Sequence, residues 1–288
     1  MHELGDFPPG TVWLVGAGPG DPELLTRKAE RLIGAADAVF HDALVGPGVL
    51  DFASPSARLV YVGKRSGRHS RDQASIDRLI VEAALAGCRV VRLKGGDPAI
   101  FGRATEELEA CRAMGVPVRI CPGVTAASAA AADLGLSLTL RGAARRLTLV
   151  TAHVRAGEAL KLDWLALADP RATLAIYMGK AAASEVASEL MNAGLAGDTP
   201  VALVENASLP GSRRFLTRLD LLPLAARTAL GRGPAVILVG ASLRGSKSGL
   251  PDDGDDSAQC RTIAPRSAPD SGAKPWSAAA ARTNSREF

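Results

Sequence analysis

The chain has 288 residues, of which 47% are hydrophobic and 22% are charged, as is ordinary for a soluble globular protein. No apolar run approaches the roughly 18 residues that a membrane span needs, and the acidic segment Met1–Asp6 lacks the apolar core of a signal peptide. We therefore expect a cytoplasmic protein with no membrane segment. The formal net charge is +4, and residues 245–288 hold six basic and six acidic residues, so the excess positive charge lies before them.

Apolar runs alternate with apolar residues at helical spacing through residues 11–120. Strands are expected at Thr11–Val15, Ala38–Phe40, Leu59–Val62, Val90–Leu93 and Val118–Ile120. Helices are expected at Glu23–Ala36, Ser75–Ala86 and from Ile100 to Met114, with Gly115 as a C-terminal cap. Strands that alternate with helices predict an α/β domain with a largely parallel sheet, in which ligands bind at the carboxyl ends of the strands.

Two of these strands run into a glycine-rich corner that ends in Gly-Asp-Pro, at Gly16–Pro22 and at Gly95–Pro98. Because glycine has no Cβ, each corner offers bare backbone against which a small molecule can lie. Each corner also has a folding explanation, since Asp is a favoured helix N-cap and Pro a favoured first helical residue. Both interpretations stay open on the residues alone.

The first corner does not fit a dinucleotide-binding turn, although Gly16-x-Gly18 follows a strand. Asp21 stands where the third glycine of that fingerprint belongs, and Pro19 removes a backbone N–H that would contact phosphate. An aspartate at a helix N-terminus also competes with a pyrophosphate for the same dipole. A nicotinamide or flavin site is therefore not expected, and the sequence has no Walker lysine motif.

The segment Pro122–Arg146 is rich in Gly, Ala and Ser, has weak strand character, and is expected to carry an inter-domain crossover. A second α/β block follows it, with a helix expected at Ala181–Ala193 and strands at Leu147–Val150, Ala172–Tyr177, Pro200–Val204, Arg213–Leu221 and Ala235–Val239. The expected division is a domain at 1–122, the crossover at 123–146, a domain at 147–243 and a disordered tail at 244–288. No metal site is expected, because the four cysteines form no CxxC pair: Cys88, Cys111, Cys121 and Cys260.

Several motifs, in order along residues 10–241, resemble the tetrapyrrole methylases. They are Val15–Pro22, Val62–Arg65, Val91–Arg103, Pro122–Ala127, Ile176–Gly179 and Pro200–Asn206. The resemblance implies the two-domain α/β fold of that family, with a largely parallel N-terminal sheet and a mixed C-terminal sheet. Within the family, the motifs are most similar to those of the branch that uses S-adenosyl-L-methionine to methylate uroporphyrinogen III at two pyrrole carbons, which gives precorrin-2 for sirohaem or cobalamin. The resemblance further implies S-adenosyl-L-homocysteine as a product, a homodimer and no nucleic-acid partner.

The resemblance also implies roles for individual residues. Asp42 is the expected proton acceptor and Lys64 the expected proton donor, and each follows a predicted strand. Arg65 and Arg141 are expected to pair with carboxylates of the acceptor. The cofactor is expected to contact Pro19, Gly95, Gly96, Asp97, Ile100, Thr125, Ala126, Met178 and Ala207.

Three alternatives remain beside this interpretation. Leu140 and Gly142 depart from the Thr-His-Arg pattern that is usual in the crossover, which keeps a methylase acting on a later precorrin in view. A ribosomal-RNA 2′-O-methyltransferase suits the basic body, but the chain is only 4% aromatic and has no basic run with interleaved aromatics. The third alternative is a homologue that binds the cofactor and serves a regulatory or scaffold role.

Overall fold

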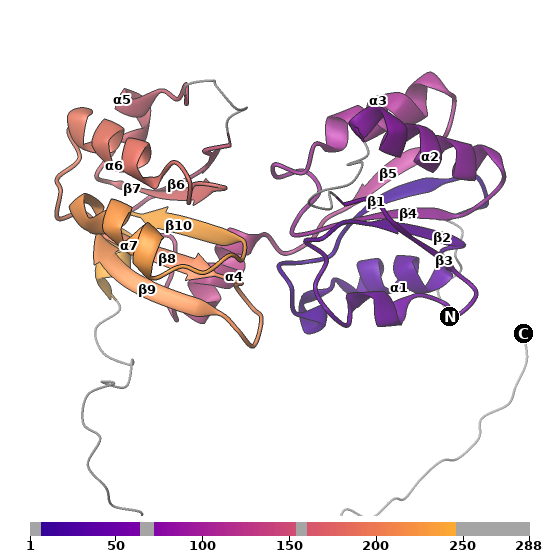
Figure 1. Cartoon of the computed structure of the whole chain (residues 1–288), viewed down its shortest axis with the longest axis horizontal. Helices are drawn as coiled ribbons and strands as arrows, with labels where there is room; N and C mark the ends of the chain where they lie inside the picture. The colour runs from indigo at the N-terminus through magenta and orange to yellow at the C-terminus, as the bar shows by residue number, and fades with distance from the viewer. Residues whose placement is uncertain (1–6, 64–71, 154–159, 246–288) are drawn as a thin grey trace, which may run out of the picture. The chain divides into compact units, whose positions relative to one another are not determined.

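Two five-stranded sheets form the framework of this computed structural model, which describes residues 7–63, 72–153 and 160–245 (Figure 1). The described residues all fall within one compact unit of the chain. Lys64, Arg65 and the part of the expected tail after residue 245 lie outside the described residues.

The first sheet is entirely parallel, in the strand order β3-β2-β4-β1-β5. Its strands are β1 (Val12–Gly16), β2 (Ala38–His41), β3 (Arg58–Tyr61), β4 (Val90–Lys94) and β5 (Val118–Cys121). Helix α1 covers one face, and α2 and α3 cover the other (Figure 1). The helical segments are η1 (Pro22–Leu24), α1 (Arg27–Ala35), η2 (Val49–Phe52), α2 (Gln73–Leu85) and α3 (Ala104–Ala113).

Strand β1 shows how the sheet acquires two cores. All five of its residues are buried, and successive side chains alternate between the faces. Trp13 and Val15 belong to the core that includes Leu32 of α1. Val12 and Leu14 belong to the core on the opposite face, with residues of α2 and α3. Strand β1 therefore has no charged or polar side chain, as expected for a strand of a parallel sheet covered on both sides.

The second sheet is mixed, in the order β6-β7-β10-β8-β9. The β6–β7 pair is parallel and the other three pairs are antiparallel. Its strands are β6 (Arg146–Thr151), β7 (Ala172–Tyr177), β8 (Pro200–Glu205), β9 (Arg213–Arg218) and β10 (Ala235–Val239). The helical segments are α4 (Ala126–Asp133), α5 (Trp164–Leu167), α6 (Ala183–Asn192), η3 (Leu219–Leu221), α7 (Leu222–Thr228) and η4 (Ala241–Gly245). The predicted fold class, with a parallel first sheet and a mixed second sheet, is confirmed.

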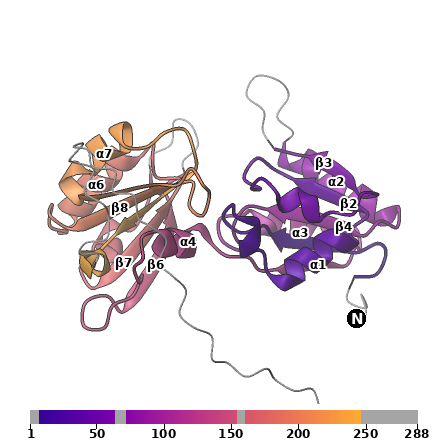
Figure 2. The ribbon, with the colours of Figure 1, turned by 90° about the horizontal axis from the view of Figure 1, so that it is seen from below.

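Helices α5, α6 and α7 pack on one face of this sheet, and α4 lies on the other (Figures 1 and 2). On the α4 face the contacts are small: Ala127 and Ala130 belong to one core with Ala175 and Ala202 of the strands. Small side chains on both sides let the helix approach the sheet closely. This brings the start of α4 near the end of β7.

Three local predictions are wrong. The crossover at 123–146 was expected to have weak strand character, but it contains the helix α4. The helix expected at Glu23–Ala36 is divided, because Thr26 accepts a hydrogen bond from Ala29 and so caps a new helix after η1. The third helix begins at Ala104 rather than near Ile100, and the preceding residues form a loop.

Candidate active site

The two Gly-Asp-Pro corners are bonded to each other. Gly18 N donates to Gly96 O at 3.2 Å, and Gly96 N donates to Gly18 O at 2.6 Å. Behind this bridge, a Cβ on Gly16 would lie 2.6 Å from Gly123 Cα and 2.7 Å from Gly96 O. Gly16 is therefore required because three backbone segments approach one another closely there, which is a folding role.

The two aspartates of the corners act differently. Asp21 accepts a hydrogen bond from Glu23 N at 2.9 Å and caps η1, as its position predicts. Asp97 caps no helix. Its Oδ1 accepts from Ala99 N at 2.7 Å, and its Oδ2 accepts from Gly123 N at 3.0 Å. Asp97 thus ties the second corner to the chain segment that leads into α4.

A cavity of about 380 Å³ opens beside this bridge. All nine residues expected to contact the cofactor line it: Pro19, Gly95, Gly96, Asp97, Ile100, Thr125, Ala126, Met178 and Ala207. Asp42 lines it as well. Arg141 does not line it, but lies exposed in the turn between the bridge partners Leu140 and Ala144. The structure thus brings together ten of the thirteen predicted site residues, whose roles stay predictions, while Lys64 and Arg65 fall outside the described residues.

One end of the cavity is apolar, and its wall contains left-handed backbone. Phe101, Arg103 and Met178 line the cavity with φ values of 53°, 55° and 56°. Ala207 also lines it and lies between Asn206 and Ser208, at φ 54° and 70°. Non-glycine residues in this region cost about 1–3 kcal/mol each and cluster at functional sites. Their concentration here marks the cavity as the candidate active site.

Tyr177, at the end of β7, joins the loops that close the apolar end. Its Oη lies 2.5 Å from Thr125 Oγ1 and accepts a hydrogen bond from Ala127 N at 3.0 Å. Its ring meets that of Phe101 with centroids 5.0 Å apart and planes inclined at 55°. A single side chain of the second sheet therefore holds the start of α4 and the loop after the second corner.

The other end of the cavity is charged. Arg92 donates from Nη2 to Asp42 Oδ2 at 3.0 Å and from Nε to Glu107 Oε1 at 2.9 Å. Lys94 donates to Glu107 Oε2 at 2.6 Å. Burial lowers the pKa of Lys94, and Arg92 lowers it further, while Glu107 raises it. The charges of these four side chains cancel when all are ionised.

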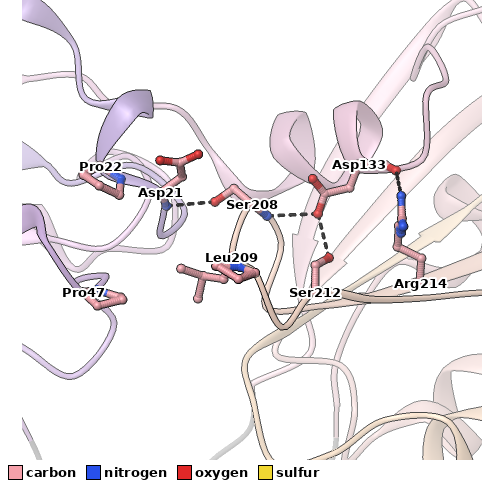
Figure 3. Close-up of a pocket in the computed structure, with 9 residues that line it drawn as sticks. Asp21, Pro22, Pro47, Asp133, Ser208, Leu209, Ser212 and Arg214 are labelled. Carbon is pink, nitrogen blue, oxygen red and sulfur yellow. Dashed lines mark hydrogen bonds between the residues drawn. The ribbon is translucent and has the colours of Figure 1, made fainter. Parts of the chain in front are cut away.

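A separate open groove of about 550 Å³ lies around Ser208 (Figure 3). Ser208 Oγ accepts a hydrogen bond from Asp21 N at 3.1 Å, and Ser208 N donates to Asp133 Oδ2 at 2.9 Å. Ser212 donates to the same carboxylate oxygen, and Arg214 donates to the backbone oxygen of Asp133. These hydrogen bonds hold the Ser208 loop to Asp21 and Asp133 (Figure 3), so the residues around the groove have a structural role.

Among the described residues, no helix has the length and apolar character needed to cross a membrane. In the same part of the chain, no group of three His, Cys, Asp or Glu side chains is placed to hold a metal ion.

Comparison with known proteins decides the family. The model of the tetrapyrrole (corrin/porphyrin) methylases matches residues 11–223. The chain belongs to the tetrapyrrole methylase family. It is 49% identical over 236 residues to a uroporphyrinogen-III C-methyltransferase of Pseudomonas aeruginosa, covering 82% of this chain and 95% of that protein.

Solved structures of other tetrapyrrole methylases share the fold. A uroporphyrin-III C-methyltransferase of Thermus thermophilus, complexed with S-adenosyl homocysteine, has a TM-score of 0.69 and 42% identity, over 81% of this chain and 99% of that one. A cobalt precorrin-4 methyltransferase has a TM-score of 0.73 and 31% identity, over 81% and 96%. The chain spans about half the length of the curated relatives named siroheme synthase, such as 51% of that from Gluconobacter oxydans.

Sequence reasoning missed four residues of this tetrapyrrole methylase site: Arg92, Lys94, Glu107 and Tyr177. Two signals were present. Arg92 and Lys94 interrupt an otherwise apolar strand, and Glu107 lies on the same helical face as Ala104 and Cys111, which are buried. Charged residues on predicted core faces are rarely buried without partners, so each of these positions indicated a buried partner of opposite charge. Tyr177 carried no such signal, because a tyrosine at a strand end is ordinary.

Proposed function

We propose that this tetrapyrrole methylase transfers methyl groups from S-adenosyl-L-methionine to two pyrrole carbons of uroporphyrinogen III, giving precorrin-2 for sirohaem or cobalamin synthesis. The observation that carries the proposal is the single cavity that gathers the nine expected cofactor contacts and Asp42. The relative that is 49% identical along nearly its full length supports the choice of acceptor.

The residues present fit the cofactor. A Cβ built on Gly96 would meet no atom within 4 Å, so the backbone there faces open space beside the cavity that Gly96 lines. Ile100, Met178 and Ala207 supply apolar walls, and the volume of about 380 Å³ lies within the usual range for small-molecule sites. When bound, the cofactor would supply a methyl group on a sulfonium: a pyrrole carbon would bond to that methyl in line, and the C–S bond would break to release S-adenosyl-L-homocysteine.

The chain's own contribution is orientation and proton transfer. Holding two reactants in line and away from water lowers the barrier of such a reaction by up to about 7–11 kcal/mol. Asp42 is proposed to accept the proton that the methylated ring loses. Its Oδ1 accepts a hydrogen bond from Leu44 N at 3.0 Å and its Oδ2 accepts one from Arg92, so the carboxylate is oriented from both sides. The proposed proton donor is Lys64, and Arg65 and Arg141 are proposed to bind acceptor carboxylates.

Two further parts of the proposal concern the assembly state, which rests on the family resemblance, and the location, which rests on the composition of the sequence. We propose that the protein is a homodimer and that it acts in the cytoplasm. Light scattering of the purified full chain measures the first, since a homodimer has twice the mass of 29.7 kDa.

The test is incubation of the purified protein with S-adenosyl-L-methionine and anaerobically prepared uroporphyrinogen III. The expected product carries two added methyl groups by mass spectrometry. Asp42→Asn should lose most of the transfer while still binding S-adenosyl-L-homocysteine, because the apolar walls are untouched. Asp198→Asn, an exposed change of the same kind, is the matched control. Full transfer by Asp42→Asn would remove this residue from the mechanism.

A methylase of a later cobalamin precursor is the second candidate, favoured by the TM-score of 0.73 with the cobalt precorrin-4 enzyme. The same assay separates the two. Tight binding of S-adenosyl-L-homocysteine with no transfer to uroporphyrinogen III, but transfer to cobalt precorrin-4, would favour this candidate.

A further inference from the structure

The charged end of the cavity rests on a buried carboxylate that the proposed reaction does not use. The side chain of Glu107 is 0% exposed, and those of Arg92 and Lys94 are each 6% exposed. Each oxygen of Glu107 accepts from one of these two cations. Asp42, at 24% exposed, is the member of the cluster with most access to solvent.

Such a cluster is costly unless every charge in it is paired. Several kcal/mol are needed to bury one ion, and a buried ion pair is often no more stabilising than apolar residues of the same volume. Removal of one partner leaves an uncompensated charge. The cluster therefore needs an explanation other than stability, and its position at the cavity suggests one.

Arg92 links Glu107 to Asp42. The guanidinium donates hydrogen bonds from Nε to Glu107, from Nη1 to the backbone oxygen of Leu93 at 2.7 Å, and from Nη2 to Asp42. A planar group held at three points has one orientation, so the Nη2–H is aimed at the carboxylate of Asp42. Glu107 supplies the anchor farthest from the cavity in this chain of contacts.

We propose that Glu107 is a positioning residue for methyl transfer, which fixes the carboxylate of Asp42 through Arg92. This inference rests on the proposed function, in which Asp42 receives the proton. Glu107 also binds Lys94, the second cation on the same strand. The ammonium of Lys94 is therefore kept from competing with Arg92 for the carboxylate of Asp42. Other charged or titratable neighbours are His41, beside Asp42, and Asp77 on α2, whose pKa is raised by the charge of Glu107 and lowered by that of Lys94.

The test is Glu107→Gln, which keeps the shape of the side chain and removes its charge. We expect kcat for methylation to fall about 100-fold, the cost of misplacing a reacting group by about 1 Å. The KM for S-adenosyl-L-methionine and the affinity for S-adenosyl-L-homocysteine should change less than about twofold, since Glu107 does not line the cavity. Glu109→Gln, exposed on the same helix, is the matched control.

A crystal structure of Glu107→Gln gives a readout that does not depend on activity. The Arg92 Nη2 to Asp42 Oδ2 separation, 3.0 Å in the native chain, should exceed hydrogen-bond distance. If Glu107→Gln does not fold, Arg92→Lys takes its place. It keeps the positive charge but lacks the planar, rigid fork whose separate nitrogens reach Glu107, the Leu93 backbone oxygen and Asp42 at once. It should show the same loss of kcat with retained cofactor affinity.

An unchanged kcat, or an unchanged separation between Arg92 and Asp42, would overturn the inference. So would a loss of cofactor affinity in step with kcat, because that outcome assigns Glu107 a purely structural role. Absence of transfer to uroporphyrinogen III by the native protein contradicts the proposed function instead. In that case the crystallographic separation decides the positioning role by itself.

Discussion

Replacing Tyr177 by Phe isolates one hydroxyl that connects stability to the cavity. Thr125 is the N-cap residue of α4 but makes no side-chain cap, and Tyr177 Oη accepts the Ala127 N–H instead. Ala127 is buried, so Tyr177→Phe leaves its amide without an acceptor, which costs about 1–3 kcal/mol. For a chain of this size, about 2 kcal/mol lowers the Tm by roughly 4–8 °C.

The measurements are thermal unfolding by circular dichroism and titration with S-adenosyl-L-homocysteine. Ligand binding should weaken as well, because Thr125 and Ala126 line the cavity. Thr125→Val removes the partner hydroxyl but leaves the Ala127 N–H bound to Tyr177, so its cost should be smaller, about 0.5–1 kcal/mol. The cost of the double variant should be smaller than the sum of the two single costs, because the two hydroxyls contact each other. A Tm for Tyr177→Phe within 1 °C of the native value, or equal to that of Thr125→Val, refutes this reasoning.

The other predictions concern stability. Gly16→Ala should destabilise by about 1–3 kcal/mol, because its Cβ would lie 2.6 Å from backbone, whereas Gly34→Ala, in helix α1 with 3.4 Å to its nearest neighbour, should stabilise by about 0.5–1 kcal/mol in urea unfolding. The backbone N–H of Arg89 holds the pKa of Asp37 below 3.8, so Asp37→Asn should lower the Tm at pH 7, and this difference should vanish as the pH falls through the lowered value. Burial raises the pKa of Asp77 above 3.8, so the ionised form costs stability; Asp77→Asn should raise the Tm at pH 7, and the gain should disappear below pH 3.8, where the native acid is protonated in both states. A pH-independent effect of either aspartate variant would contradict the assignment.

The alternation of strands and helices was readable from the sequence because the apolar periods are clear. Local composition misled at α4, where alanine covers every face and leaves no apolar stripe to indicate a helix. It also misled at Thr26, where a second capping residue divides one continuous apolar pattern into two helical segments. The loop at Pro98–Arg103 carried a helix-start signal, but the left-handed backbone at Phe101 and Arg103 depends on tertiary contacts.

The candidate site was predictable where it depends on motifs and not where it depends on pairing between distant elements. Nine cofactor positions followed from the resemblance, and the structure places all nine at one cavity. The contact of Arg92 with Asp42 joins residues 50 positions apart, and that of Thr125 with Tyr177 joins residues 52 positions apart. No local pattern specifies such partners. The sheet order, which sets β4 beside β2, is what creates the first of them.

The lining of the cavity extends along the chain from Pro19 to Val236. During synthesis, no complete site exists until β10 has emerged and paired, so a ligand can bind only chains that have been synthesised through β10. Binding then acts on both sheets at once, and ligand at 100 times its Kd adds about 2.7 kcal/mol to their common stability. A protease can cleave within a sheet only after that sheet unfolds locally, and the unfolding of either sheet also disrupts the cavity. Bound ligand should therefore slow cleavage in both sheets by the same factor.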